Sequence, residues 1–174
     1  MSQPHSDLQP GRSTSVTAGL RRVLAPNPSA LTGPGTNSYI VGEGRVALID
    51  PGPDDPAHFA ALLAALAPGE VVEAIIVTHA HHDHSALAPR LAAHLHAPVL
   101  AFGTALEGRN PALAALPHLG GGEGLDLGFR PDMRLADGDS VTGPDWSLRA
   151  LHTPGHLGNH ICLSWGAALF SGDM

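Results

Sequence analysis

Residues 77–84 read VTHAHHDH, which places four histidines and one aspartate directly after the mostly apolar run 71–76. If that run is a strand, side chains two residues apart point the same way, so His79 and His81 can aim at one point beyond its end. Asp83 and His84 then open a helix, where an acidic side chain is favoured. A solvated polar loop is the alternative, but the spacing His-x-His-x-Asp-His favours a metal site.

Imidazole and carboxylate ligands favour zinc, as one or two ions, or another divalent first-row ion. A catalytic zinc commonly takes three protein ligands and a water, so further ligands must come from elsewhere in the chain. In HTPGHLGNH at 152–160, the turn at Pro154-Gly155 presents His156 just after a strand. Asp173 follows the apolar stretch ALFS at 168–171. The sequence therefore predicts coordinating groups at several strand ends.

The segments around the cluster alternate between strand and helix. Strands are expected at 37–41 and 45–49, joined by a glycine-rich hairpin, and at 71–78 and 97–102. Asp55 as N-cap, Pro56 at N1 and Pro68-Gly69 as the end predict a helix, and a second helix is expected at 85–96. This alternation is typical of an α/β fold.

The remainder of the chain is less regular. An irregular segment with one short helix is expected at 103–130. Strands follow at 147–151, 160–165 and 167–171, and the last two abut across Gly166 as a tight hairpin or as one bent strand. Residues 1–14 are expected to be a flexible lead-in, and 15–174 a single domain.

Composition narrows the functional classes. The 174 residues carry a formal net charge of −7 with no basic cluster, so nucleic acid is disfavoured as a partner, although it stays open. No apolar stretch suits a membrane span or an export signal, and the single Cys162 forms no internal disulfide. We expect a cytoplasmic protein. Its nine basic residues are all Arg, which suggests a bacterial genome rich in GC.

At this point the chain resembles the metallo-β-lactamase superfamily. THAHHDH at 78–84 is similar to its metal-binding signature, TPGH at 153–156 to its third-histidine turn, SGD at 171–173 to its bridging aspartate, and LIDPG at 48–52 to its first motif. The opening NPSALTGPGTNSYIVG at 27–42 resembles the branch of glyoxalase II-like hydrolases and β-lactamase-like endoribonucleases.

The resemblance implies an αββα sandwich and a role for each matching position. His79, His81 and His156 would hold one metal, Asp83 and His84 a second, and Asp173 would bridge both. Asp50 would support the site without touching metal, and His160 matches a recurrent histidine of unassigned role.

Family members continue to a further histidine that completes the second metal site, but no histidine follows His160 here. We therefore expect a fragment that contains the first half of the sandwich and part of the second. An uncovered sheet edge would then favour self-association into homo-oligomers.

The resemblance implies a metal-dependent hydrolase that attacks an ester, thioester or related small substrate with metal-bound hydroxide, with Asp83 orienting the water or accepting its proton. An RNA nuclease of the same fold, a non-catalytic metal-binding remnant and an iron-dependent redox member are the alternatives.

The other histidines are not expected to bind metal. Surface or helix-terminal positions are expected for His58, His94 and His96, and loop positions for His5 and His118. His82 should point away from its neighbours, and His152 lies close to the turn. Cys162 is expected to be a small core residue.

Overall fold

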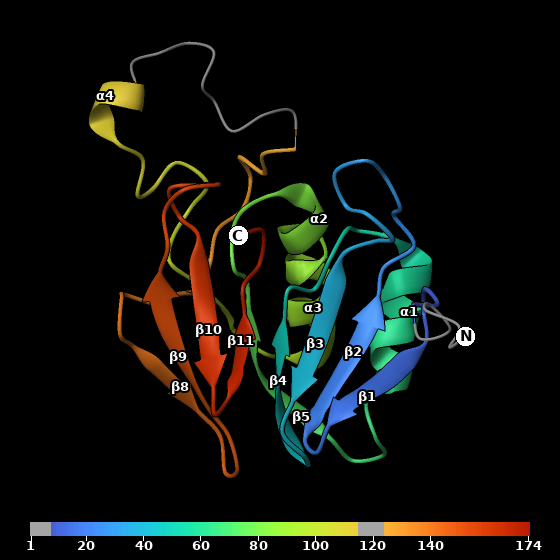
Figure 1. The fold of residues 1–174 in the computed structure, drawn as a ribbon. Coiled ribbons are helices and arrows are strands. Elements are labelled where there is room, and N and C mark those ends of the chain that lie inside the picture. The colour runs from blue at the N-terminus through green and yellow to red at the C-terminus, as the bar shows by residue number, and fades with distance from the viewer. Residues whose placement is uncertain (1–7, 115–123) are drawn as a thin grey trace, which may run out of the picture.

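The computed structural model describes residues 8–114 and 124–174, which form two β-sheets packed face to face with helices on the outer side of the larger sheet (Figure 1). The predicted mixed α/β architecture is confirmed. Among the described residues lie a helical layer and both sheets of the expected sandwich.

The larger sheet has seven described strands in sequence order, antiparallel from the first to the fourth and parallel from the fourth to the seventh. They are β1 Ser13–Thr17, β2 Leu20–Leu24, β3 Asn37–Val41, β4 Arg45–Ile49, β5 Val71–Ile76, β6 Val99–Ala101 and β7 Met133–Arg134. Parallel neighbours require crossovers, and the helices that follow β4 and β5 supply two of them.

The smaller sheet has four described strands, all antiparallel, in the order β11-β10-β9-β8. They are β8 Ser140–Thr142, β9 Ser147–His152, β10 Ile161–Trp165 and β11 Ala168–Phe170. Of the two alternatives predicted across Gly166, the structure has the hairpin, in which β10 pairs with β11. Gly166 has φ 55°, in the left-handed region that glycine enters without strain.

The first helix, α1 (Pro56–Ala65), begins as predicted. The Asp55 side chain accepts a hydrogen bond from the backbone N–H of His58 at 2.8 Å, and Pro56 stands at the start of the helix. A short helix, α4 (Pro111–Ala114), lies within the predicted irregular segment.

The helix predicted at 85–96 is confirmed over most of its length by α3 (Ala88–Leu95). Its predicted start is wrong, because Ser85 ends a separate short helix, α2 (His82–Ser85), and a turn separates the two. Pro89 explains the break. It has no N–H to donate to the carbonyl of Ser85, and its ring would clash with that carbonyl in a continuous helix.

Two apolar cores lie on the two faces of the larger sheet. Leu48 and Ile75 are fully buried against α1 and α3, and Ile49 and Ile76 are fully buried between the sheets. Each such side chain contributes about 1.5–3 kcal/mol when removed from water. Because β4 and β5 are buried on both faces, the loop that leaves β5 starts from a rigid position.

The sequence did not predict four of the described strands, β1, β2, β7 and β8. The edge strand β1 is mostly exposed and polar, β2 carries two adjacent arginines, and β7 and β8 are very short, so none shows an apolar alternation. Strand pairing also begins before the predicted domain start, since Pro10 forms a bridge with Leu24. No described helix is both long and apolar enough to span a bilayer.

His58 was expected at the surface, and this is wrong. Its side chain is 0 % exposed, and its Nε2 lies 3.0 Å from Oγ of Ser38. Gly52 packs directly on the ring, since a Cβ there would lie 2.7 Å from Nε2. Burial lowers the pKa of His58 to about 4, although Asp55 opposes the shift.

This burial predicts an acid-labile fold. The unfolded chain binds a proton at His58 near pH 6.5 whereas the folded chain does so near pH 4, so stability present above pH 6.5 is lost as the pH falls toward 4. The loss amounts to about 3 kcal/mol at most. We expect His58→Gln to flatten this part of the pH dependence, measured by urea unfolding of the metal-free protein. His94→Gln, at an exposed position, should keep the wild-type slope, and an unchanged slope in His58→Gln would contradict the prediction.

Candidate metal centre

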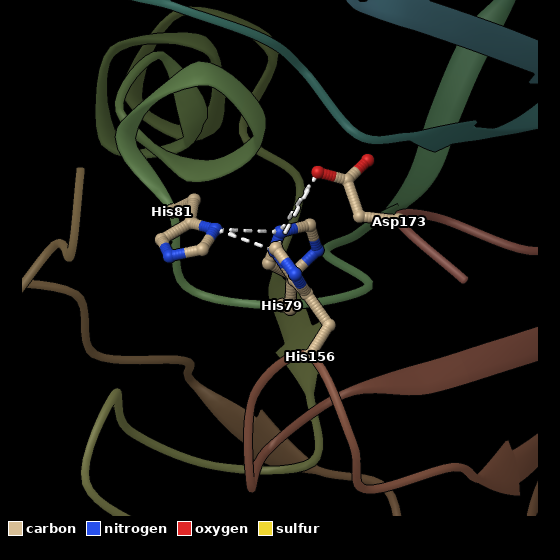
Figure 2. A group of neighbouring side chains, drawn as sticks. All are labelled: His79, His81, His156 and Asp173. Atoms are coloured by element: carbon tan, nitrogen blue, oxygen red, sulfur yellow. Dashed lines mark hydrogen bonds and ion pairs between the residues drawn. The ribbon is translucent and has the colours of Figure 1, made fainter. Parts of the chain in front are cut away.

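Three histidine nitrogens converge at one end of the sheets. Nδ1 of His81 lies 3.1 Å from Nε2 of His79 and 2.9 Å from Nε2 of His156. The Asp173 carboxylate faces them, with Oδ2 at 3.8 Å from the His79 nitrogen and 3.5 Å from the His156 nitrogen (Figure 2). We call these four residues the three-histidine group.

A second cluster shares Asp173. Oδ1 of that carboxylate lies 3.2 Å from Nε2 of His84, which in turn lies 3.5 Å from Oδ2 of Asp83. We call these three residues the Asp83 group. Asp173 offers one oxygen to each group, so the six side chains picked out in the sequence lie close together in the fold.

The ligand atoms come from separate elements of both sheets. His79 and His81 lie in the loop after β5, Asp83 and His84 lie in α2, His156 lies in the turn between β9 and β10, and Asp173 follows β11. The two sheets are joined beside the site by a backbone hydrogen bond of 2.9 Å from Ile161 N–H to the carbonyl of Thr78.

The three-histidine group fits a tetrahedral ion. Bonds of about 2.0–2.1 Å to zinc place neighbouring ligand nitrogens about 3.3 Å apart, close to the separations of 2.9 and 3.1 Å. Three imidazole nitrogens that face each other so closely repel one another unless a proton or a cation lies among them. A cation satisfies all three lone pairs at once.

Asp50 fixes which nitrogen of His79 is free. Oδ1 of Asp50 accepts from the backbone N–H of Thr78 at 2.8 Å, and Oδ2 accepts from the Thr78 hydroxyl at 2.9 Å. With its proton committed, that hydroxyl accepts from Nδ1–H of His79 at 3.1 Å. The lone pair of His79 therefore lies on Nε2, the atom that faces the group.

The same carboxylate orients His84. Nδ1 of His84 donates to Oδ2 of Asp50 at 2.9 Å, which turns Nε2 toward Asp83 and Asp173. Asp50 itself belongs to neither group, as the resemblance implied for a supporting residue.

The pKa values of His79 and His156, in the three-histidine group, shift in the opposite direction from that of His84, in the Asp83 group. Burial lowers the pKa of His79, and the neighbouring His84 lowers it further, while burial and His81 lower the pKa of His156. Burial also acts to lower the pKa of His84, but Asp50 and then Asp173 outweigh it and raise the pKa to about 10. A hydrogen bond from His84 lowers the pKa of Asp173. The lowered pKa values of His79 and His156 favour their neutral forms, which offer nitrogen lone pairs to the group.

His160 lies behind the three-histidine group. It is fully buried, its Nδ1 lies 2.8 Å from the Thr153 hydroxyl, and its ring centre lies 5.2 Å from that of His79. Nε2 of His160 has no hydrogen-bond partner among the described residues. Gly172, with φ 51°, passes over this nitrogen, because a Cβ there would lie 2.6 Å from it. His160 is therefore a packing neighbour that requires glycine just before Asp173.

His152 supports the turn that carries His156. Its ring stacks on Phe102 with centres 3.9 Å apart and planes at 5°, and its Nε2 lies 2.9 Å from the carbonyl of Gly158. His82 points away from the cluster as predicted, with its side chain 58 % exposed. His94 and His96 are exposed and Cys162 is buried, as expected, whereas His5 and His118 lie outside the described residues.

A cavity of about 230 Å³ adjoins the Asp83 group. Leu31, Tyr39 and Leu169 line it together with Asp83, His84 and Asp173. Sequence reasoning missed one further neighbour of the site, Thr36, whose hydroxyl lies 3.0 Å from Oδ2 of Asp83. Thr36 stands directly before β3, in the stretch TNSYIVG that the resemblance already included.

Relatives of this chain are found among curated proteins. A Beta-lactamase-like protein 2 homolog of Drosophila melanogaster is 34 % identical over 169 residues, covering 92 % of this chain and 53 % of that protein. An Atrochrysone carboxyl ACP thioesterase of Aspergillus chevalieri is 32 % identical over 162 residues, covering 91 % and 46 %. The chain thus spans about half the length of the curated relatives that it matches.

A solved structure shows the same fold. The Beta-lactamase domain protein from Burkholderia ambifaria superposes with a TM-score of 0.67 at 23 % identity, covering 94 % of this chain and 55 % of that one. The family model of the metallo-beta-lactamase superfamily matches residues 31–174, which include every residue of both groups. By this match, together with its fold and the placement of its histidines and aspartates, the chain belongs to the metallo-β-lactamase superfamily.

Proposed function

We propose that this chain binds one or two zinc ions and contributes the metal site of a hydrolase that acts on a small ester or thioester. The observation that carries the proposal is the convergence of three histidine nitrogens, in which Nε2 of His79 and Nε2 of His156 both lie within 3.1 Å of Nδ1 of His81. A carboxylate shared with a second cluster lies beside them. A bound divalent ion would lower the pKa of water from about 15.7 toward about 7 and polarise a scissile carbonyl, so no Ser or Cys nucleophile is needed.

The protein side chains would hold and orient the reactants. His79, His81 and His156 would hold one ion, Asp83 and His84 would hold a second, and Asp173 belongs to both groups. The Asp83 carboxylate lies beside the cavity, where it would orient water or accept its proton.

A small thioester suits the charge of the molecule better than RNA does. Several arginines are already paired with acidic side chains: Arg21 with Glu70, Arg45 with Glu73, Arg90 with Asp54 and Arg134 with Glu107. Such pairs leave little unbalanced positive charge for a phosphate backbone. The relative from Aspergillus chevalieri, named as a thioesterase, supports the same substrate class.

Metal removal tests the proposal directly. We expect the zinc-loaded protein to release thiol from a short acyl thioester, and chelation to abolish this release until zinc is restored. His79→Ala and His156→Ala should each lose the ion of the three-histidine group and all activity, because each removes one of three nitrogen ligands. Zinc content by elemental analysis and thiol release by absorbance are the two measurements.

The matched control is His94→Ala, which removes an exposed histidine outside the site and should change neither quantity. Full turnover after chelation, or in either site variant, would exclude the proposed mechanism. One bound ion without turnover would favour a non-catalytic metal-binding role, and cleavage of RNA but not thioester would favour the nuclease alternative.

The role of Asp50 gives a second prediction. Asp50→Asn puts an amide where the carboxylate accepts three hydrogen bonds, so the orientation of His84 and the tautomer of His79 are no longer fixed. We expect zinc affinity to fall by about 10–100-fold, measured by competition with a chromophoric chelator. Asp54→Asn, at an exposed carboxylate, is the control. Unchanged affinity in Asp50→Asn would show that this carboxylate does not tune the site.

A further inference from the structure

Asp83 is held by a chain of side chains that begins in the loop between β2 and β3. Asn27 contacts Thr36 twice: its Oδ1 accepts from the backbone N–H of Thr36 at 2.9 Å, and its Nδ2 donates to the Thr36 hydroxyl at 3.1 Å. The same hydroxyl lies 3.0 Å from Oδ2 of Asp83. Three residues from two separate segments therefore form one continuous hydrogen-bonded path to the site.

The direction of each hydrogen bond is determined. The backbone N–H of Thr36 can only donate, so the facing atom of Asn27 is the carbonyl oxygen, and its amide nitrogen must be the one that faces the hydroxyl. The Thr36 hydroxyl accepts that bond, so its own proton is free for Asp83. An ionised carboxylate only accepts hydrogen bonds, and the path therefore ends on Oδ2 with a single orientation.

The hydrogen-bonded path from Asn27 through Thr36 reaches the Asp83 group and not the three-histidine group. Oδ2 of Asp83 is the oxygen that lies 3.5 Å from Nε2 of His84, so the Thr36 hydroxyl fixes the atom that faces the Asp83 group. Thr36 is buried, with 5 % of its surface exposed. A hydrogen bond to a ligating carboxylate restricts its rotamer and tunes metal affinity.

The loop that carries Thr36 is braced by its own hydrogen bonds. The N–H of Ala25 donates to the carbonyl of Thr36 at 2.9 Å, and the Thr32 hydroxyl donates to the carbonyl of Asn27. Leu31, at the tip of this loop, lines the cavity beside Asp83. The arrangement of the loop and the orientation of Asp83 are thus coupled through Thr36.

We propose that Thr36 is a positioning residue that sets Asp83 for metal binding in the Asp83 group, and that Asn27 orients its hydroxyl. This inference rests on the proposed function. It assigns different supports to the two ions: Thr36 acts on the Asp83 group alone, whereas Asp50 orients histidines of both groups.

Thr36→Val tests the inference, because it keeps the shape of the side chain and removes the hydroxyl. We titrate the metal-free protein with zinc against a chromophoric chelator, and assign the two binding steps with His156→Ala, which removes the step of the three-histidine group. Thr36→Val should weaken the step of the Asp83 group by about 10–100-fold and leave the other step unchanged. Thr36→Ser, which retains the hydroxyl, should restore the wild-type value.

The matched control is Thr32→Val, which removes a hydroxyl from the same loop without a contact to Asp83. It should leave both zinc-binding steps unchanged, and the melting temperature of each metal-free variant shows how far loop bracing alone affects stability. Equal weakening of both steps, an equal effect of Thr32→Val, or a single zinc ion bound by the wild type would overturn the inference. Two bound ions with no effect of Thr36→Val refute this inference alone, whereas a wild type that binds no zinc also refutes the proposed function.

Discussion

The buried carboxylate of Asp50 is the constraint on which the site depends. It stands at the end of β4 with φ 50°, a left-handed conformation that Asp tolerates better than most residues, and it reaches across to the end of the neighbouring strand β5. There it accepts two hydrogen bonds from Thr78 and one from His84. One side chain therefore connects the pairing of two core strands with the orientation of ligand nitrogens in both groups.

The site lies between the two sheets because the apolar core between them holds their loop ends side by side. The loop after β5 brings His79 and His81 from the larger sheet, while His156 and Asp173 come from the smaller one. An ion bound by all four would link the sheets, so metal binding and the packing of the sheets stabilise each other. The regions that meet at the candidate site, such as the loop after β5 and the residues after β11, are almost 100 residues apart in the sequence, and the packing of the two sheets holds them together.

Much of this arrangement could be predicted from the sequence because its signals are local. Apolar runs and glycine turns located β3 to β6 and β9 to β11, the Asp55-Pro56 pair located the start of α1, and motif resemblance brought the six ligand candidates into one site. Contacts between distant segments were not visible in the same way. The burial of His58, the hydrogen bond from Thr36 to Asp83 and the tautomer of His79 depend on tertiary packing, which no spacing rule contains.

The backbone hydrogen bond between Ile161 and Thr78 bears on how this chain tolerates substitutions near the candidate site. Since it joins main-chain atoms, almost any side-chain replacement leaves it intact, and only proline at 161 would remove its donor. Substitutions of the surrounding side chains should therefore leave unchanged the distance between His79 and His81, from the larger sheet, and His156 and Asp173, from the smaller one. Side chains that line the cavity, such as Leu31 and Leu169, can therefore be substituted while the two sheets stay joined beside the candidate site.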